Sequence, residues 1–399
     1  MEEFAVQFRH VSMEFPGVLA NDDISLDIRC GEVFALVGEN GAGKTTLMNI
    51  LYGINEPTAV LTPQETDELF KVIRKVVKEH GMTVIIITHK LYEVMAISDR
   101  VGVMRKGRLI GVENTADVTE RSLASMMVGR PVLYESLEKT GTPGEELISA
   151  DDLVVRGNRG LVAVNGVSLS VRAGEILGIA AIEGNGQSEL LEAITGMRAL
   201  ESGSVRICGK EAAGKSPGEI RALGLAHIPE DRLTTGVSRD AATADNLIMG
   251  RQREKRFSGP LMHMNIAAVN AYAQQLYDGF DIRGAGIEAR TGSMSGGNMQ
   301  KVVVAREFSF DTPVLVISQP TRGVDVGAIE FIHSAIIKKR NEGCAVLLCS
   351  ADLDEVFRLS DRIITMYEGK ITGEFAAGEI SKEEIGYYMT GDRQGAKDK

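Results

Sequence analysis

The sequence predicts an α/β protein made of two related halves, each with a parallel central sheet and a P-loop-like core. Landmarks of the first third of the chain recur later in the sequence. Short apolar runs such as Val84–Ile87 and Val314–Ile317 are typical of strands buried in parallel sheets, and helical patterns alternate with them. In both halves a glycine-rich turn follows an apolar strand, Val33–Val37 in one and Ile176–Ala180 in the other.

Length and charge restrict the function before any motif is considered. A chain of 399 residues is long enough for two domains. Its formal net charge of −11 argues against a nucleic-acid partner, because phosphate backbones bind basic surfaces. The start, Met1-Glu2-Glu3, does not resemble a secretory signal, and no apolar run reaches the roughly 18 residues of a spanning helix. We therefore expect contact with a membrane only through another protein.

The four cysteines show no spacing that is typical of a metal site. Neither CxxC nor CxxH occurs around them. We expect all four to be small buried side chains in a reducing cytoplasm: Cys30, Cys208, Cys344 and Cys349.

The repeat is interrupted in the first half. Gly31 and Gly174 open equivalent strands and are 143 residues apart, whereas Thr88 and Ser350 follow equivalent later strands and are 262 residues apart. The first half therefore lacks 119 residues that the second contains. The offset changes between residues 47 and 56, directly after the first glycine-rich turn and the start of its helix.

A short polar segment joins the halves. Residues 134–146 contain Gly141, Pro143 and Gly144 and lack an apolar pattern, which is typical of a linker. The sequence therefore predicts a first half over residues 1–138, a linker over 139–146 and a second half over 147–393.

A capping box predicts a helix beyond the gap. Thr62-Pro63-Gln64-Glu65 has the capping pattern with proline at the first helical position, and Gly81 is the expected end. The apolar side chains of this helix fall on one face: Leu69, Phe70, Ile73, Val76 and Val77.

The first glycine-rich turn predicts a phosphate site. Residues 38–45 fit the pattern G-x-x-x-x-G-K-[ST] between a strand and a helix, where glycines let backbone N–H groups face the phosphates. The helix N-terminus adds positive potential. Lys44 is expected to reach the β- and γ-phosphates, and the Thr45 hydroxyl to ligate Mg²⁺. The candidate nucleotide-binding residues are Gly38, Glu39, Asn40, Gly41, Ala42, Gly43, Lys44, Thr45 and Thr46.

Two further residues are candidates for contact with the nucleotide. Phe15 precedes Pro16-Gly17 and could stack on an adenine ring, or alternatively serve as a core or turn aromatic. His89 directly follows the strand Val84–Ile87. Ligands of open α/β sheets bind at the carboxyl ends of strands, so we expect His89 to contact the γ-phosphate.

A second helix N-terminus in the other half carries the decisive motif. Ser295-Gly296-Gly297-Asn298-Met299-Gln300-Lys301 resembles the signature motif of ABC ATPases. A hydroxyl and glycine amides at a helix N-terminus suit a phosphate group. The resemblance implies that Ser295, Gly296 and Gly297 bind the γ-phosphate of ATP held on the P-loop of the opposite half.

Nearly all of the chain resembles the tandem ATP-binding subunits of simple-sugar and nucleoside ABC importers. Further matches are residues 15–20, 56–63, 88–91, 183–189, 228–232 and 319–327. The stretch from Gln319 to His333 looks most like the nucleoside branch. The resemblance implies an antiparallel β subdomain beside each central sheet, ATP and Mg²⁺ as cofactors, and integral-membrane permease subunits as partners at the cytoplasmic face of the cell membrane. A solute-binding protein would be an indirect partner.

The second half resembles a degenerate site. At the repeat offsets the P-loop lysine becomes Gln187 and the switch histidine becomes Ala351. Ser318 and Gln319 stand where the family has the acid that organises Mg²⁺ and the catalytic glutamate. A neutral glutamine supplies neither the ammonium charge nor the base, so we expect this half not to hydrolyse ATP.

The gap leaves two interpretations of Glu56. It occupies the family's catalytic-base position before Pro57, but a P-loop helix over about Lys44–Tyr52 would carry the chain roughly 13 Å away. Residues 53–55 would return about 10–11 Å, so we expect no strand there. Alternatively, residues 55–58 are the loop that ordinarily follows the P-loop helix. Either way we expect ATP binding with weak or absent hydrolysis and an unstable first half.

Three functional classes compete. The leading one is the energising ATPase subunit of a nucleoside or sugar importer. The alternative is a non-hydrolysing nucleotide-binding remnant or regulatory subunit of such a transporter, which the missing strand favours. A tandem ABC protein acting on ribosomes or DNA is disfavoured by the net charge of −11 and by the match to importers.

Overall fold

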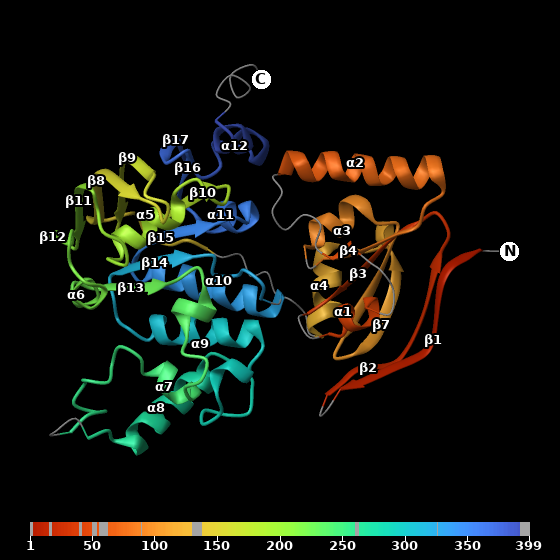
Figure 1. The fold of residues 1–399 in the computed structure, drawn as a ribbon, viewed down its shortest axis with the longest axis horizontal. Coiled ribbons are helices and arrows are strands. Elements are labelled where there is room, and N and C mark those ends of the chain that lie inside the picture. Colours follow the sequence, from red (N-terminus) through yellow and green to blue (C-terminus); the bar gives the residue numbers. More distant parts are fainter. Residues whose placement is uncertain are drawn as a thin grey trace. The chain divides into compact units, whose positions relative to one another are not determined.

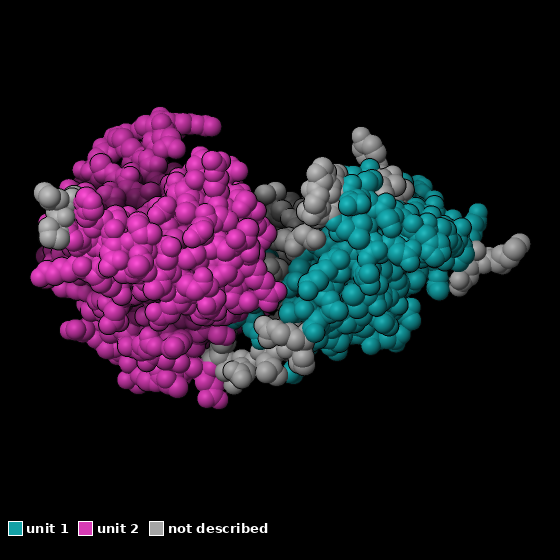
Figure 2. Space-filling model, turned by 90° about the horizontal axis from the view of Figure 1, so that it is seen from below, with its two compact units in different colours: residues 1–135, 323–330 teal, residues 136–322, 331–399 magenta. Residues whose placement is uncertain are grey.

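The computed structural model describes residues 3–15, 18–39, 42–49, 54–55, 63–88, 90–129, 138–259, 263–324 and 326–391. The chain divides into two compact units, coloured separately in Figure 2. Unit 1 comprises residues 1–135 and 323–330, and unit 2 comprises residues 136–322 and 331–399. Within the described ranges, none of the helices combines the length and apolar character needed to cross a bilayer.

Unit 1 contains a five-stranded sheet and a separate antiparallel pair of strands (Figure 1). The sheet order is β4-β5-β3-β6-β7, and β1 pairs with β2. Pairing is parallel from β4 to β6, and β7 is antiparallel to β6. The elements are β1 (Phe4–Phe15), β2 (Val18–Arg29), β3 (Val33–Gly38), α1 (Lys44–Met48), β4 (Ile54–Asn55), α2 (Pro63–His80), β5 (Val84–Ile87), α3 (Leu91–Ile97), β6 (Arg100–Arg105), β7 (Arg108–Asn114) and α4 (Glu120–Val128).

The central strand of unit 1 separates two apolar clusters. On one side Phe34 and Leu36 pack with Ile24 of β2 and with α1. On the other side Ala35 and Val37 pack with helices α3 and α4. All six residues of β3 are buried, which explains why this strand reads as a continuous apolar run.

Unit 2 is larger and has a six-stranded and a four-stranded sheet. Their orders are β13-β14-β15-β10-β16-β17 and β12-β11-β8-β9. The strands are β8 (Glu146–Arg156), β9 (Val162–Arg172), β10 (Ile176–Ala181), β11 (Ser202–Ile207), β12 (Lys210–Glu211), β13 (Leu225–Ile228), β14 (Val314–Ser318), β15 (Ala345–Ser350), β16 (Arg362–Tyr367) and β17 (Lys370–Ala376). The helices are α5 (Gln187–Ile194), α6 (Pro217–Ala222), α7 (Thr243–Leu247), α8 (Ile266–Gly279), α9 (Gly296–Phe308), α10 (Val326–Asn341), α11 (Leu353–Leu359) and α12 (Lys382–Met389).

The core of unit 2 lies between its two sheets. Leu177 and Ile179 of β10 pack with α5 and with the four-stranded sheet in one large cluster. On the opposite face, Ala180 packs with α11 and α12. The layers therefore repeat those of unit 1, as the fold class predicts.

Strand register confirms the repeat offsets. Val33 pairs with Val84 in unit 1, and Ile176 pairs with Val346 in unit 2. Val33 and Ile176 are 143 residues apart, and their partners Val84 and Val346 are 262 residues apart. These are the two offsets found in the sequence. The strands predicted at Val84–Ile87 and at residues 33–37 are also confirmed.

The connection after the first P-loop corrects two expectations. α1 ends at Met48 instead of continuing to about Tyr52, and a strand forms before Glu56. Ile54 and Asn55 make β4, which pairs parallel with β5. A helix of five residues rises only about 7.5 Å, so the short connection can return to the sheet.

The described elements of unit 1 lack counterparts of a long stretch of unit 2. Between α5 and β14, unit 2 contains β11, β12, α6, β13, α7, α8 and α9. Between α1 and β4, unit 1 has only residues 49–53. Because the β13 equivalent is missing among the described residues, β4 lies at the edge of its sheet, whereas β14 lies inside.

Two other expectations had mixed outcomes. The predicted helix after the gap exists as α2, with Phe70 and Ile73 buried. The cysteines are not uniformly buried: Cys344 and Cys349 are buried, Cys208 is partly covered and Cys30 is exposed. Cys30 lies in the turn that follows β2 and is exposed there.

Candidate nucleotide-binding site

Close backbone packing shapes the first P-loop. Gly43 caps α1 in the left-handed conformation, with φ of 91°, and a Cβ there would lie 2.2 Å from the carbonyl oxygen of Ala20. The buried Asn21 side chain donates to the Gly43 carbonyl at 3.1 Å. At the other end of the loop, a Cβ on Gly38 would lie 2.3 Å from the Met104 carbonyl. Only glycine fits both positions.

Lys44 folds back over this loop. Its Nζ donates to the Gly38 carbonyl at 2.8 Å and to the Glu39 carbonyl at 3.1 Å. The ammonium group therefore lies at the mouth of the backbone turn, while the adjacent Thr45 is exposed. A glycine-formed turn at a helix N-terminus, a lysine across it and an accessible hydroxyl fit a nucleotide phosphate chain with Mg²⁺.

The second P-loop has the same backbone but a different charge. Gly186 caps α5 with φ of 96°, and its Cβ would lie 2.1 Å from the Ala163 carbonyl. Gln187 is buried and donates from Nε2 to the Ile182 carbonyl at 3.1 Å. Its Oε1 is buried without a partner among the described residues. The second P-loop therefore has the backbone shape of the first but an amide in place of the ammonium group.

An internal network closes the end of the second P-loop. Ser188, at the position of Thr45, donates its hydroxyl to Glu230 at 2.7 Å. Arg322 pairs with the other oxygen of Glu230 at 3.1 Å and lies 3.9 Å from Glu183. The carboxylates therefore already have a cationic partner, and the network contributes no free positive charge for a polyphosphate.

Neutral residues also stand at the other second-half positions that align with the family's catalytic residues. Gln319 follows β14 with a positive φ of 48° and accepts the backbone N–H of Ala351 at 3.1 Å. Ser318 is buried. Gln319, at the position of the family's catalytic glutamate, and Ala351, at the position of its switch histidine, are thus joined by a hydrogen bond between neutral groups.

The signature motif begins a long buried helix. Ser295 caps α9, and its hydroxyl accepts from the Asn298 backbone at 3.4 Å and from the Asn298 side chain at 3.0 Å. Lys301 anchors the first turns by donating to the backbone and carboxylate of Asp281 at 2.7 and 3.1 Å. The Ser295 end of α9 is therefore held in a fixed position.

The far end of α9 is held by a buried charge cluster. Glu307 has a fully buried side chain and pairs with Arg221 at 2.8 Å and Arg306 at 2.7 Å. Its carboxylate also accepts the backbone N–H of His227 in β13 at 3.3 Å. Sequence reasoning missed this cluster because its members come from separate elements.

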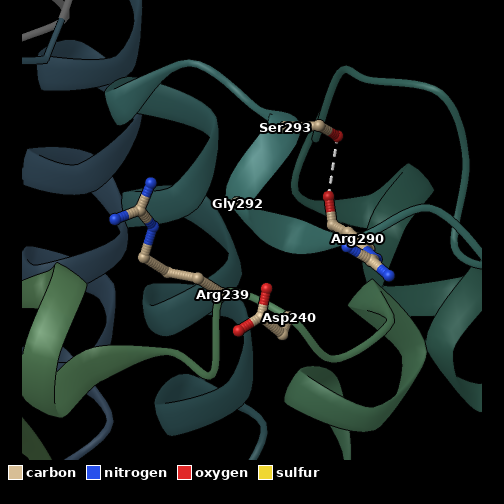
Figure 3. Close-up of a pocket in the computed structure, with 5 residues that line it drawn as sticks. All are labelled: Arg239, Asp240, Arg290, Gly292 and Ser293. Atoms are coloured by element: carbon tan, nitrogen blue, oxygen red, sulfur yellow. Dashed lines mark hydrogen bonds between the residues drawn. The ribbon is translucent and has the colours of Figure 1, made fainter.

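A shallow polar cavity lies beside the signature (Figure 3). It measures about 480 Å³ and is lined by Arg239, Asp240, Arg290, Gly292 and Ser293. The guanidinium groups of Arg239 and Arg290 point away from each other in Figure 3. They therefore do not converge on a common ligand.

The residues on either side of His89 in unit 1 are held by the carboxylate of Glu93. Thr88 donates its hydroxyl to the buried carboxylate of Glu93 at 2.8 Å, and Lys90 lies 3.4 Å from the other oxygen. Neither Thr88 nor Glu93 was among the sequence candidates. His89 itself, like Glu56, Asn40 and Gly41, lies outside the described residues, as does the side chain of Phe15 at the end of β1.

Register bears on the two interpretations of Glu56. Asn55 pairs with Ile87 as Ser318 pairs with Cys349. β4 thus stands where β14 stands in unit 2. This favours the interpretation in which Glu56 occupies the family's catalytic-base position, directly after the strand equivalent to β14.

Two layered α/β units with P-loop turns and a serine-capped signature helix define a tandem nucleotide-binding protein of the P-loop class. The family model described as ABC transporter matches residues 21–94 and 164–322. The chain therefore belongs to the ABC transporter family, which binds nucleotide, and membership implies ATP hydrolysis by resemblance.

Relatives match over nearly the whole chain. The nucleoside import ATP-binding protein NupA of Lactococcus lactis is 32% identical, covering 98% of both chains, and the guanosine import ATP-binding protein NupO of Bacillus subtilis is 33% identical with the same coverage. A glucose import ATP-binding protein of Haloferax volcanii is 42% identical over 90% of this chain and 67% of its own. A dimeric bacterial ABC transporter cassette shares the fold, with a TM-score of 0.51 at 18% identity over 59% of this chain and 100% of that chain.

Proposed function

We propose that this chain is the ATP-binding subunit that energises an ABC importer for nucleosides or simple sugars. The observation that carries the proposal is the asymmetry of the two P-loops. Lys44 crosses the first, whereas Gln187 occupies the second. The relatives named above import nucleosides, guanosine or glucose. One working nucleotide site, completed by the signature of the second half, accounts for these features together.

In this proposal residues 38–46 hold the phosphates of ATP, with Lys44 on the β- and γ-phosphates. The Thr45 hydroxyl would be a ligand of Mg²⁺, which when bound would supply positive charge to the phosphate oxygens. Phe15 stacks on the adenine. Glu56 acts as the base and His89 contacts the γ-phosphate, while the second half contributes Ser295, Gly296 and Gly297. The register of β4 supports the assignment of Glu56.

The partners follow from the same class. Integral-membrane permease subunits would receive the conformational change, and a solute-binding protein would act upstream of them. The chain would then be peripheral, at the cytoplasmic face of the cell membrane. Residues 215–300 of the second half are the surface proposed to press on a permease. No nucleic-acid partner is proposed, in keeping with the net charge of −11.

A second candidate is a non-hydrolysing nucleotide-binding subunit of such a transporter. Asn55 favours this candidate. It holds the strand position that Ser318 holds in unit 2, where the family has the acid that organises Mg²⁺, and an amide stands there instead. The two candidates differ in one measurable property, which is turnover after ATP has bound.

Mg-ATP turnover by the purified chain distinguishes them. We expect slow turnover that falls at least about tenfold in Lys44→Ala and in Glu56→Gln, because each removes one required group. Binding without turnover in the unaltered chain would select the non-hydrolysing subunit. Turnover that survives in Lys44→Ala would reject both.

A further inference from the structure

A short basic segment lies between α7 and α8 in a chain whose net charge is −11. Residues 251–256 read Arg-Gln-Arg-Glu-Lys-Arg, and no further Asp or Glu occurs before Asp278. We call residues 251–259 and 263–266 the basic loop. It lies at the outer edge of unit 2 in Figure 1, beside α8. Positive charge is therefore concentrated at one place on the surface of this unit.

Two arginines and a buried phenylalanine fix the basic loop against the rest of unit 2. The side chain of Arg251 is only 11% exposed, and its guanidinium lies over the Phe310 ring, 4.2 Å from the ring centroid. Phe257 is buried against Tyr272 of α8, and Arg256 lies 4.4 Å from the centroid of each of these two rings. The basic loop is thus a structured surface that presents a defined set of side chains outward.

The outward basic side chains of the loop are not neutralised. Glu254 pairs with Arg251 at 2.9 Å and with Arg256 at 2.8 Å, so the two anchoring arginines share the one carboxylate of the segment. Arg253 and Lys255 are exposed, and among the described contacts neither side chain has a partner. Two long, flexible cations therefore remain available for an anionic surface.

Exposed apolar side chains lie on the same loop. The carbonyl of Phe257 accepts the backbone N–H of Asn265 at 2.8 Å. Ser258 and Met264 form an antiparallel bridge, so the start of α8 lies beside the basic segment. Met264 is 37% exposed and Ile266 is 61% exposed. Basic side chains beside exposed apolar ones suit the surface of an anionic membrane, where headgroup charge and acyl chains lie at adjacent depths.

We propose that the basic loop binds the surface of an anionic membrane directly. Arg253 and Lys255 contact the lipid headgroups, and Met264 and Ile266 enter the boundary between headgroups and acyl chains. This goes beyond the proposed function, in which the chain reaches the membrane only by docking onto a permease. Nucleic acid also carries phosphates, but it has no apolar layer that would cover Met264 and Ile266.

Co-sedimentation of the purified full chain with lipid vesicles tests the proposal. We expect binding to phosphatidylcholine vesicles that contain about a third phosphatidylglycerol, weaker binding at high salt and little binding to pure phosphatidylcholine. Arg253→Glu/Lys255→Glu should weaken binding at least about twentyfold, because each basic side chain near such a surface contributes about fivefold. Arg159→Glu/Lys210→Glu is the matched control. It changes the net charge equally at exposed residues outside the basic loop and should bind like the unaltered chain.

A second pair of variants tests the apolar part of the contact. Ile266→Ser should weaken vesicle binding by about threefold or more, because less apolar surface leaves water. This factor should not change with salt, in contrast to the loss from the charge variant. Leu161→Ser is the matched control, since Leu161 is 72% exposed in the turn between β8 and β9, outside the basic loop. It should leave binding unchanged.

Several results would overturn the lipid contact. These are no binding to anionic vesicles, equal binding to neutral ones, and equal losses in the two charge variants. A chain that ignores vesicles but loses transport in cells through Arg253→Glu/Lys255→Glu would assign the basic loop to an acidic permease segment instead. The vesicle measurements use neither ATP nor a permease. Their failure therefore leaves the proposed function standing, and a failure of Lys44→Ala to weaken ATP binding would reject that function without touching the lipid contact.

Discussion

Lys44 and Gln187 donate hydrogen bonds to equivalent carbonyl oxygens of the two P-loops. The Lys44 ammonium contacts Glu39 and the Gln187 amide contacts Ile182, each at 3.1 Å. The amide therefore preserves the internal contact of the loop while removing the charge that a polyphosphate requires. Loop shape and nucleotide affinity are separable in this molecule.

The two cap glycines should show this separation. Gly43→Ala and Gly186→Ala each place a Cβ within 2.2 Å of a carbonyl oxygen at a positive φ. We expect both to destabilise their unit by about 1–3 kcal/mol. Only Gly43→Ala should also abolish ATP binding, as measured by titration calorimetry beside thermal unfolding. Equal losses of ATP binding in the two variants would show that both loops hold nucleotide.

Restoring an acid on β4 should raise turnover. Asn55 ends β4 in the register of Ser318, and a carboxylate there would organise Mg²⁺ better than an amide. We expect Asn55→Asp to increase Mg-ATP turnover by at least about threefold. Ser318→Asp is the control and should have no effect, since Gln187 still lacks the charge. A gain with Ser318→Asp, or none with Asn55→Asp, would contradict the assignment of β4.

The buried charge cluster of α9 should dominate the stability of unit 2. Glu307→Ala leaves Arg306, only 6% exposed, and Arg221 without their carboxylate, a loss that costs about 3–5 kcal/mol in comparable buried pairs. Glu201→Ala removes an exposed pair with Arg156 and should cost under about 1 kcal/mol. Denaturant unfolding measures both. Similar costs would mean that the cluster is not a determinant of stability.

Acid should weaken unit 2 through His227. Burial lowers the pKa of His227 to about 4; Arg221 and Arg306 add to this, and Glu307 opposes it. The unfolded side chain titrates near 6.5, so between pH 6.5 and 4 the unfolded state binds the extra proton and stability falls as the pH drops. Because His227 keeps some exposed surface, we expect only about 1–2 kcal/mol between pH 7 and 5. His227→Gln should show a correspondingly smaller pH dependence, and an unchanged one would refute this origin.

Features with local signals could be predicted from the sequence. The strand β3, the helix α2 and the P-loop pattern depend on residues that are neighbours in the chain. The repeat offsets extended this to strand register, because equivalent strands of the two halves pair alike. The same comparison identified Gln187 as the degenerate position.

Features that depend on distant contacts could not be predicted. Local propensity does not say that α1 ends at Met48, because pairing of β4 with β5 competes with further helix. Arg232 belongs to a stretch that matched the importer family, yet its proximity to Gly296 joins segments far apart in sequence. Cys30 was expected to be buried from its residue type, but its place at a turn exposes it.

The number of ATP molecules bound per chain tests the central claim most directly. Titration calorimetry on the purified chain should give one ATP per chain, no binding in Lys44→Ala and unchanged binding in Gln187→Ala. A stoichiometry of two, or ATP affinity that depends on Gln187 instead of Lys44, would contradict a single nucleotide site on the first P-loop.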